Sequence, residues 1–396
     1  MAIRGEHEGN GSGRAWYGIA FLLLGLLACL VLTRPATAVE PEPDPEPEPT
    51  LKLTRIASFG SAIDVRPAPG FPRLLFVTDI SGRVWVLRNG KKIDRPFLNI
   101  ADRVRWASES GMYSIAFPPD YAKSRRFYVY YVDRKGDIRL DEFRRKTAVR
   151  AARNTMRNVL TIRHRASDSH YGGHMHFDGN LLYVATGDGG LPGDPFGWAQ
   201  DPHNLLGKML RINPKRKGKR PYTVPATNPH IGRGRPEVFA IGFRNPYRWT
   251  FDRYTSPGRT RLALTDVGFD RFEEVTYLPL DEVRGANFGW PNYEGRLLVG
   301  APLRIAAMPT FVLPHPENCA IVGGMVVRDR SLPSLLGRYL FSDFCNDELR
   351  SVVPGQVDPE IKGTGVHLRA ITSLGEGPAG GVYATTYMGG LYRLSE

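Results

Sequence analysis

Beyond residue 50 the chain alternates between short apolar runs and polar turns. The runs are rich in β-branched and aromatic residues, Gly, Pro, Asn and Asp separate them, and no stretch keeps a helical period. This pattern predicts an all-β body, with short helical exceptions around Ser331–Leu336 and Thr147–Arg153. The clearest strands are predicted at Arg73–Asp79, Arg83–Arg88, Arg126–Val132, Leu181–Thr186, Met209–Ile212, Glu237–Ile241, Arg261–Asp266, Arg338–Phe344 and Val382–Tyr387.

Several of these runs repeat one form, an apolar alternating strand that ends in Thr and often Asp. Leu75–Asp79, Leu262–Asp266 and Val382–Thr386 are examples, and their irregular spacing is typical of propeller blades with unequal loops. A body of about 345 residues allows roughly six four-stranded antiparallel blades. Because Leu391–Leu394 lies almost at the end of the chain, we expect Leu51–Ile56 to complete the last blade and remove an exposed edge.

The N-terminal segment has the pattern of an export signal. Ala15–Leu32 is apolar, Arg4 and Arg14 precede it, and the small residues Ala36–Ala38 follow it. We therefore expect residues 1–38 to be a signal peptide, cleaved after Ala38. Two alternatives stay open, an uncleaved membrane anchor, since about 18 to 20 apolar residues span a bilayer, and lipid attachment at Cys29.

Residues 39–50 contain a strict alternation of acidic residues and proline from Glu40 to Pro49. Such a segment cannot form a helix, and its charges repel one another along an extended chain. The expected organisation is therefore a signal peptide, an acidic spacer and one propeller over residues 51–396. We expect an exported protein, periplasmic or extracellular, with the N-terminal segment as an alternative membrane tether.

The formal net charge of the chain is +13. A basic chain is suited to nucleic acids or anionic surfaces, but export argues against a nucleic-acid partner. The densest basic clusters, Arg144–Lys146 and Lys215–Lys217, lack interleaved aromatic residues. We interpret them as solvated loops.

Cysteine usage indicates an oxidising compartment. Removal of the leader with Cys29 leaves an even pair, Cys319 and Cys345. Cys319 opens one strand-like run and Cys345 closes the next, so an antiparallel hairpin brings them together. The sequence therefore predicts a disulfide, with two separate buried thiols as the alternative.

The densest group of chemically active residues lies between residues 169 and 190. His170 precedes a Gly pair, and the ordinary pKa of imidazole, about 6.5, suits a general base near neutral pH. Asp188, at the end of the neighbouring strand, is placed to orient that ring. His174 and His176 also suggest zinc, but no Cys or Glu completes a standard zinc set, and a purely structural turn stays open.

Two further stretches carry charged residues at strand ends. Arg244 follows a strand and precedes Asn-Pro, a position suited to an anionic ligand or to developing negative charge. The loop Asp266–Glu274 offers main-chain and carboxylate oxygens to a hard cation such as calcium. From the residues alone, a surface ion pair is the favoured explanation of Arg244, and a solvated turn is the more economical explanation of the acidic loop.

Six motifs follow one another in a fixed order, namely Ser110–Tyr121, His170–Gly173, Thr186–Gly190, Asn204–Lys208, Gly242–Pro246 and Asn287–Pro291. Together they resemble the motifs of the soluble quinoprotein glucose, aldose and sorbosone dehydrogenases. The resemblance covers nearly all of the chain from about residue 53 and implies a six-bladed β-propeller. It also implies oxidation of a sugar at its anomeric hydroxyl to the lactone, with pyrroloquinoline quinone and calcium as cofactors and a further electron acceptor.

The resemblance implies a catalytic role for three residues. His170 is similar to the general base of this family and Asp188 to the acid that orients it. Arg244 is similar to the residue that faces the reactive quinone carbonyl. In the implied reaction, His170 removes the hydroxyl proton while a hydride passes to the quinone.

The resemblance also implies binding positions for the cofactors. Asn245 and Arg369 resemble residues that contact the quinone, and Arg328 is a further candidate. Gly268 and Phe269 resemble the loop whose main-chain carbonyls hold calcium.

The sequence departs from the family pattern at two expected cofactor contacts. Glu109 stands where a glutamine is usual, and His367 replaces an arginine. A carboxylate that faces an anionic cofactor is unfavourable unless it is protonated or paired. Glu109 and His367 are nevertheless included among the expected cofactor contacts.

Two alternative functions follow from these departures and from the fold. One is a non-catalytic envelope propeller that binds carbohydrate or another partner, and the other is a calcium-dependent lactonase-like hydrolase. No Gly-x-Ser-x-Gly turn supports a serine hydrolase. We expect the insertions Lys215–Arg235 and Arg296–Cys319 to rim the substrate cleft and set its specificity.

Overall fold

The computed structural model describes residues 50–229, 231–253, 259–304 and 306–396. The expected signal peptide, and the acidic spacer apart from residue 50, lie outside the described residues. Within the described part, no helix has the length and apolar character needed to cross a membrane.

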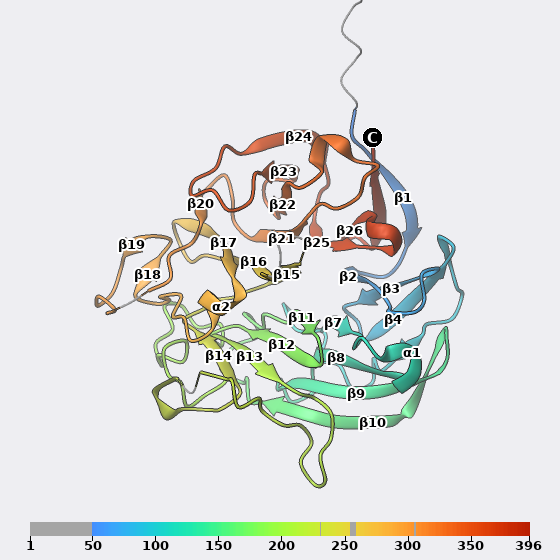
Figure 1. Ribbon diagram of the computed structural model, residues 1–396, viewed down its shortest axis with the longest axis horizontal. Coiled ribbons are helices and arrows are strands. Elements are labelled where there is room, and N and C mark those ends of the chain that lie inside the picture. Colours follow the sequence, from blue (N-terminus) through green and yellow to red (C-terminus); the bar gives the residue numbers. More distant parts are fainter. Residues whose placement is uncertain (1–49, 230, 254–258, 305) are drawn as a thin grey trace, which may run out of the picture. The chain divides into compact units, whose positions relative to one another are not determined.

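Six small antiparallel sheets form a ring, each sheet being one blade of a β-propeller (Figure 1). The prediction of an all-β, six-bladed propeller with four-stranded blades is confirmed, and one blade carries a short extra strand. The blades, from inner to outer strand, are β2 (Ala62–Pro67), β3 (Leu74–Asp79), β4 (Arg83–Arg88) and β5 (Lys91–Lys92), with β6 (Leu98–Asn99) also on β4; β7 (Met112–Ala116), β8 (Arg126–Val132), β9 (Ile138–Thr147) and β10 (Arg150–Ile162); β11 (Met175–Asp178), β12 (Leu181–Thr186), β13 (Lys208–Ile212) and β14 (Val238–Ile241); β15 (Arg248–Asp252), β16 (Arg261–Asp266), β17 (Phe272–Pro279) and β20 (Phe311–Pro314); β21 (Ile321–Val326), β22 (Tyr339–Asp343), β23 (Glu348–Val352) and β24 (Lys362–His367); and β25 (Ile371–Glu376), β26 (Val382–Thr386), β27 (Gly390–Ser395) and β1 (Lys52–Ser58).

The ring is closed by the first described strand. β1 pairs antiparallel with β27, with Lys52 opposite Ser395, so both ends of the described chain share one blade. This confirms the predicted closure. Pairing the last blade with the N-terminal strand covers the edge that it would otherwise expose.

Helical structure is confined to short turns. The helical turn expected near Ser331–Leu336 is present, but the one expected at Thr147–Arg153 is wrong, because that segment is the tip of the β9–β10 hairpin, whose apolar side chains pack against the core. The remaining short elements are α1 (Tyr121–Ser124), α2 (Leu280–Val283), the hairpin of β18 (Tyr293–Glu294) and β19 (Leu297–Leu298), and 3-10 turns at Ile231–Arg233, Pro333–Leu335 and Pro378–Gly380.

The hydrophobic core is divided into six clusters, each of which joins neighbouring blades. Phe76 and Phe127, for example, link the first two blades, and Val65 and Leu391 link the first to the last. Burial of each such apolar side chain contributes about 1.5 to 3 kcal/mol. The strands therefore need apolar residues on both faces, as β3 shows with all six of its residues buried.

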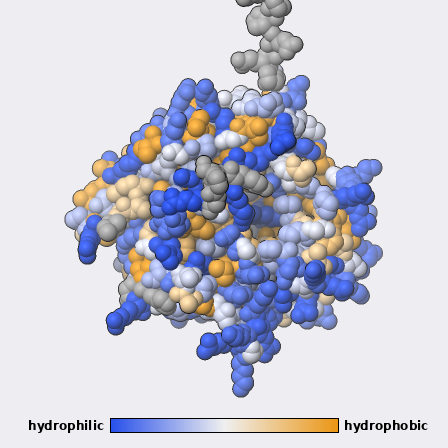
Figure 2. Space-filling view, in the orientation of Figure 1, coloured by the Kyte–Doolittle hydropathy of each residue, from blue (hydrophilic) through white to orange (hydrophobic). Residues whose placement is uncertain are grey.

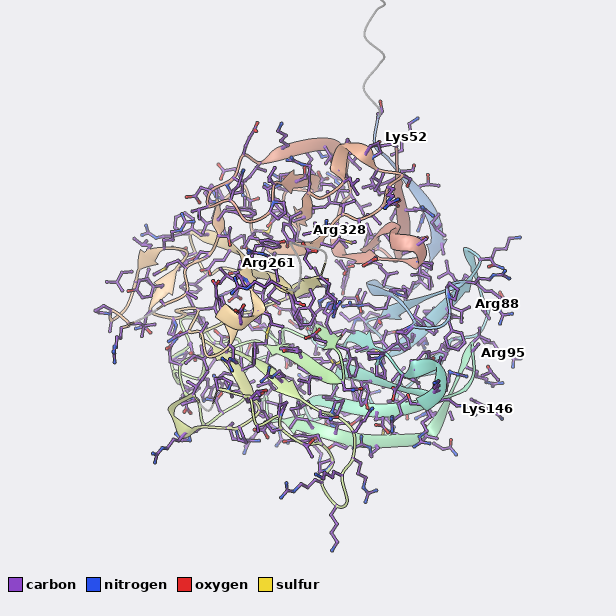
Figure 3. The ribbon with its side chains drawn as sticks, in the orientation of Figure 1. Lys52, Arg88, Arg95, Lys146, Arg261 and Arg328 are labelled. Carbon is purple, nitrogen blue, oxygen red and sulfur yellow. A yellow bond between two sulfur atoms is a disulfide. The ribbon has the colours of Figure 1, made fainter. Side chains whose placement is uncertain are left out.

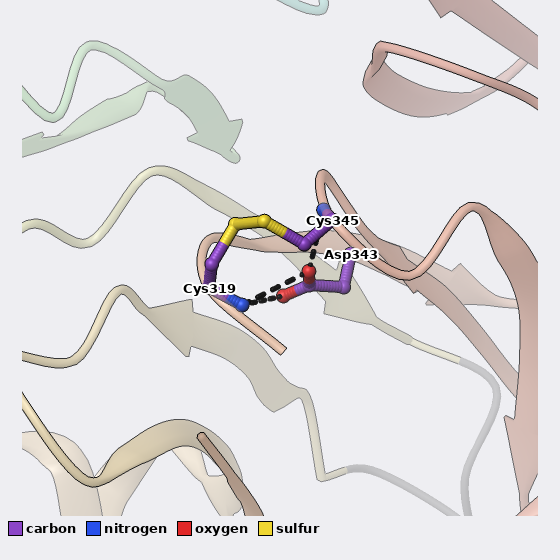
Figure 4. A group of neighbouring side chains, drawn as sticks. All are labelled: Cys319, Asp343 and Cys345. Carbon is purple, nitrogen blue, oxygen red and sulfur yellow. Dashed lines mark hydrogen bonds between the residues drawn. A yellow bond between two sulfur atoms is a disulfide. The ribbon is translucent and has the colours of Figure 1, made fainter. Parts of the chain in front are cut away.

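The predicted disulfide between Cys319 and Cys345 is present, with Cα atoms 5.6 Å apart. Asp343, at the end of β22, accepts hydrogen bonds from the backbone N–H groups of both cysteines (Figure 4). The bond joins the start of β21 to the turn after β22. It therefore fixes the entrance to the fifth blade.

The surface carries the positive charge of the chain. In the view of Figure 2 hydrophilic residues dominate, and apolar residues appear in small scattered groups. Lys146 and Arg88 lie at the periphery in Figure 3, and both side chains are exposed. Arg144–Lys146 does not form the predicted solvated loop, because it lies in β9, where Arg144 and Lys146 are exposed and Arg145 packs over the Phe71 ring.

Candidate active site

His170 and Asp188 form the centre of the candidate site. His170 Nδ1 lies 2.8 Å from Asp188 Oδ1, and the Asp188 side chain is fully buried. Because a carboxylate oxygen accepts this bond, Nδ1 carries the proton and Nε2 keeps its lone pair. The His170 side chain is 12% exposed, so the ring is held in place yet accessible.

The backbone around His170 is held in an uncommon conformation. His170 has a φ of +56°, which non-glycine residues rarely adopt. A Cβ atom at Gly187 would lie 2.0 Å from the His170 carbonyl oxygen, so the close approach of the two connections requires glycine there. Such local strain is frequent at functional sites.

Two further groups fix the Asp188 carboxylate. Trp290 Nε1 donates to Oδ2 at 2.8 Å, and the Gly190 N–H donates to Oδ1 at 2.9 Å. Both carboxylate oxygens are therefore hydrogen-bonded. The orientation of His170 depends on this arrangement, since Asp188 has no freedom to rotate away.

Arg244 lies next to this pair. Its carbonyl oxygen accepts a hydrogen bond of 2.8 Å from the Asp188 N–H, and its Nη1 donates to the Val267 carbonyl at 2.9 Å. The guanidinium carbon is 5.5 Å from the ring centre of Phe269 and 5.7 Å from that of Trp290. Its buried Nε has no hydrogen-bond partner among the described residues. A half-buried guanidinium beside two aromatic rings, with a donor unused, fits a planar anionic ligand.

Asp266 positions Arg244 and its neighbour. The backbone N–H groups of Arg244 and Asn245 donate to the Asp266 carboxylate at 2.9 Å and 2.6 Å. Burial raises the pKa of Asp266 to about 7, although these two N–H groups and the Arg244 charge act in the opposite direction. The side-chain oxygen of Asn245 accepts from the Gly172 N–H at 3.0 Å, which ties Arg244 to the His170 connection.

The loop that contains Gly268 and Phe269 lies beside Arg244. Glu294 holds it, because its Oε1 accepts hydrogen bonds from four consecutive N–H groups, including those of Phe269 and Asp270. Burial raises the pKa of Glu294, but these four donors outweigh it and the net pKa is lowered. No hydrogen bond from the described residues reaches the carbonyl oxygens of Gly268 and Phe269. Those two oxygens suit a hard cation.

The remaining expected cofactor contacts have different environments. The Glu109 carboxylate accepts the His170 N–H at 2.9 Å, so this residue lies at the site. His367 pairs with Asp347 at 2.8 Å, and the Arg369 side chain is 94% exposed just before β25. The structure therefore joins Glu109 directly to His170, whereas His367 and Arg369 share the carboxylate of Asp347.

Arg328 is not part of this site. Glu109, His170 and Arg244 all precede inner strands, whereas Arg328 follows β21 and pairs with Asp252, which ends β15, at 2.7 Å. The C-terminal ends of the inner strands line a cavity of about 560 Å³ that includes both residues, and Figure 3 places Arg328 near the centre of the ring. The expectation that Arg328 binds the cofactor is wrong. Each inner strand starts at the end of the propeller that carries His170 and finishes at the opposite end, where Arg328 lies.

The first of the two predicted insertions begins away from this site. Residues 215–235 follow β13, which runs from Lys208, opposite Thr186, to Ile212, opposite Leu182. The insertion therefore starts at the end of the blade away from Asp188. Trp290, which contacts Asp188, and Glu294, which holds the Gly268 loop, precede the other predicted insertion, Arg296–Cys319.

His174 and His176 are structural residues rather than zinc ligands. Both lie beside Arg66, and His174 Nδ1 accepts the Trp249 N–H at 3.2 Å. Burial and the Arg66 charge lower the pKa of His174 from 6.5 to about 3. Among the described residues, the only group of metal-ligating side chains is Cys319, Asp343 and Cys345, whose sulfur atoms form the disulfide.

Sequence reasoning did not assign roles to Trp290, Asp266 and Glu294. Trp290 lies in the motif Asn287–Pro291, but a tryptophan alone does not indicate which carboxylate it contacts. Asp266 ends a strand that repeats the apolar-Thr-Asp form, and that form is the one available signal. Glu294 has no signal, because its contacts depend on how residues 269–272 fold.

The chain is similar in sequence to several known proteins. A family model described as Glucose / Sorbosone dehydrogenase matches residues 63–393. The chain is 25% identical over 376 residues to the HIPL2 protein of Arabidopsis thaliana, covering 76% of this chain and 53% of that protein. It is 27% identical to the human Hedgehog-interacting protein, covering 68% of this chain and 39% of that protein. It is 26% identical to an aldose sugar dehydrogenase of Escherichia coli, covering 64% of this chain and 68% of that protein. The chain spans about half the length of the first of these relatives.

Solved structures have the same fold. The soluble aldose sugar dehydrogenase of Escherichia coli, in its apo form, superimposes with a TM-score of 0.72 at 20% identity, over 87% of this chain and 99% of that chain. The PQQ-bound aldose sugar dehydrogenase of Streptomyces coelicolor gives a TM-score of 0.65 at 18% identity, over 87% and 98%. At these identities the likeness establishes the six-bladed fold.

Proposed function

Because the chain belongs to the Glucose / Sorbosone dehydrogenase family, we propose that it oxidises an aldose or related sugar at the anomeric hydroxyl, with pyrroloquinoline quinone as cofactor. The observation that carries the proposal is the pair His170 and Asp188 beside Arg244. A base with a free Nε2, a fixed carboxylate behind it and a cation next to it form the set that such an oxidation needs.

The residues of this chain divide the chemistry among them. His170 Nε2 accepts the proton of the anomeric hydroxyl, and Asp188 stabilises the imidazolium that forms. Pyrroloquinoline quinone, when bound, supplies the acceptor for the hydride. Arg244, Asn245 and Arg369 would hold its anionic groups, and the lone Nε donor of Arg244 supports this assignment.

Calcium is proposed as the second cofactor. The carbonyl oxygens of Gly268 and Phe269 would hold it, as no hydrogen bond from the described residues uses them. A cation held there would lie beside Arg244, and both positive charges would favour negative charge on a bound ligand. The lactone is the product proposed for an aldose substrate.

The proposed setting is an exported protein, periplasmic or extracellular. The disulfide supports it, because such bonds persist in oxidising compartments. The N-terminal segment is the candidate membrane tether. A sugar and a separate electron acceptor are the proposed partners, and no nucleic acid is expected.

The first experiment is a calorimetric titration of the purified protein with pyrroloquinoline quinone, with and without calcium. Tight binding that depends on calcium supports the proposal, and a panel of aldoses with a dye acceptor then identifies the substrate. Absence of binding favours a non-catalytic propeller, the second candidate, for which the similarity to the Hedgehog-interacting protein is the supporting observation. Turnover of a chromogenic ester would instead favour the lactonase-like alternative.

A further inference from the structure

A second cavity, of about 730 Å³, lies between the segment that follows β10 and the β12–β13 connection. Both segments belong to the His170 end of the propeller, but His170, Asp188 and Arg244 do not line the cavity. The side chains that matter for binding are Arg163, Arg165, Phe196, Trp198, His203 and Arg235.

Two aromatic rings form one wall of this cavity. The rings of Phe196 and Trp198 are stacked, with centres 4.8 Å apart and planes inclined by 28°. Phe196 is nevertheless 61% exposed. Because one face of its ring lies on Trp198, the exposed area belongs to the other face and the edges. Together with the partly buried Trp198, Phe196 thus presents an aromatic face to the cavity.

The charged groups of the cavity all have one sign. Arg165 is held by Asp137 at 2.8 Å and Arg235 by Glu237 at 3.0 Å, but both carboxylates are buried outside the cavity wall. Arg163 is exposed and takes part in no ion pair with another described residue. Among the described residues, no acidic side chain lines the cavity. Its chemistry is therefore complementary to an anion.

The aromatic wall is rigid. The Asp194 carboxylate accepts the Trp198 N–H at 2.9 Å and the Ala199 N–H at 2.8 Å, and the buried Lys208 donates through Nζ to the Trp198 carbonyl at 2.6 Å. These contacts fix the backbone that carries Trp198. Because the wall is already ordered in the free protein, binding of a ligand costs no conformational entropy for ordering these residues.

The cavity wall is also in contact with the backbone of the candidate site. A Cβ atom at Gly189 would lie 2.6 Å from the Trp198 ring, so the ring packs directly on the residue after Asp188. Arg163 and Arg165 lie a few residues before His170 in the same connection. The cavity and the candidate base are thus parts of one pair of loops.

We propose that this cavity binds an acidic sugar unit, a pyranose that carries a carboxylate. The apolar face of a pyranose ring matches the open face of Phe196, and its carboxylate matches the guanidinium of Arg163 and of its neighbours. This inference goes beyond the dehydrogenase assignment, since it concerns binding and requires no turnover. It makes uronic-acid saccharides the expected ligand class.

The test is a calorimetric titration of the whole protein, without added quinone, with a trimer of α-1,4-linked galacturonate. Maltotriose serves as the neutral ligand of equal length. Phe196→Ala and Arg163→Gln remove the ring and the unpaired charge. Leu298→Ala and Arg88→Gln change exposed residues on other blades and serve as matched controls. Thermal unfolding of each variant establishes that it is folded.

The expected result is submillimolar binding of the acidic trimer, weakened at least tenfold by each cavity variant and unchanged by the controls. Equal binding of maltotriose, or no binding of either saccharide, would overturn the proposal. Binding of an acidic peptide in place of the trimer would also overturn it and identify a protein-docking surface. Because the readout is binding without cofactor, failure of the dehydrogenase proposal leaves this result interpretable.

Discussion

His170 Nδ1 lies 2.8 Å from Asp188 Oδ1, although one residue precedes β11 and the other follows β12. The register of the third blade explains this, because β11 and β12 are antiparallel, with Met175 opposite Val184. The start of one strand therefore meets the end of the next. Antiparallel pairing thereby brings two residues that are 18 positions apart in the sequence within hydrogen-bonding distance.

The first prediction concerns this pair. His170→Ala should reduce dye-linked sugar oxidation by about 10²- to 10⁴-fold, the usual contribution of a general base. Asp188→Asn should also reduce kcat, because a neutral amide no longer stabilises the imidazolium that forms on His170, and its nitrogen cannot accept the hydrogen bond that Trp290 Nε1 donates to the carboxylate. Both variants should bind pyrroloquinoline quinone, and this is the control for folding. Full activity of His170→Ala would show that another group removes the proton.

The second prediction concerns Glu109. Glu109→Gln keeps an oxygen that accepts the His170 N–H but removes a negative charge from a site proposed to bind an anion. The dissociation constant for pyrroloquinoline quinone should fall by roughly tenfold, as expected when a like charge is removed at close range. Titration calorimetry measures this change.

Glu360→Gln is the control for the Glu109 experiment, since its carboxylate is exposed in the connection between β23 and β24. That variant should leave the dissociation constant unchanged. If Glu109→Gln weakens binding instead, the carboxylate contributes favourably, either protonated or paired with a cation.

The sequence predicted the strands and the closure because apolar alternation and turn residues are local properties. Leu181–Thr186 and Arg261–Asp266 were predicted with the bounds that the structure has. The error at Thr147–Arg153 arose because a hairpin tip that packs against a core has no local strand signal. Arg328 was misplaced for a different reason, since a motif gives the order of residues but not the end of the propeller to which each strand delivers them.

The third prediction concerns the disulfide. The double variant Cys319→Ser, Cys345→Ser should lower the free energy of unfolding by about 3 kcal/mol, because the bond closes a loop of moderate length in the unfolded chain. Denaturant titration measures the loss. Wild-type protein unfolded under reducing conditions should show the same value, and an unchanged free energy would indicate that the bond adds no stability.

The fourth prediction concerns the pH dependence of stability. His174 is buried, and its pKa is lowered to about 3 in the folded protein against an ordinary value of 6.5. Between these values the unfolded chain binds a proton that the folded chain does not, so the stability from this residue is lost as the pH falls from 6.5 towards 3. In His174→Gln, which keeps an acceptor for the Trp249 N–H, unfolding at pH 5 should take up about one proton fewer than in the wild type. Calorimetric unfolding in buffers of different ionisation enthalpy measures the uptake, and the exposed residue His203, changed to Gln, is the control. Equal proton uptake in His174→Gln and wild type would mean that His174 is charged in the folded protein. A neutral imidazole would then not explain the buried contact between Arg66 and this ring.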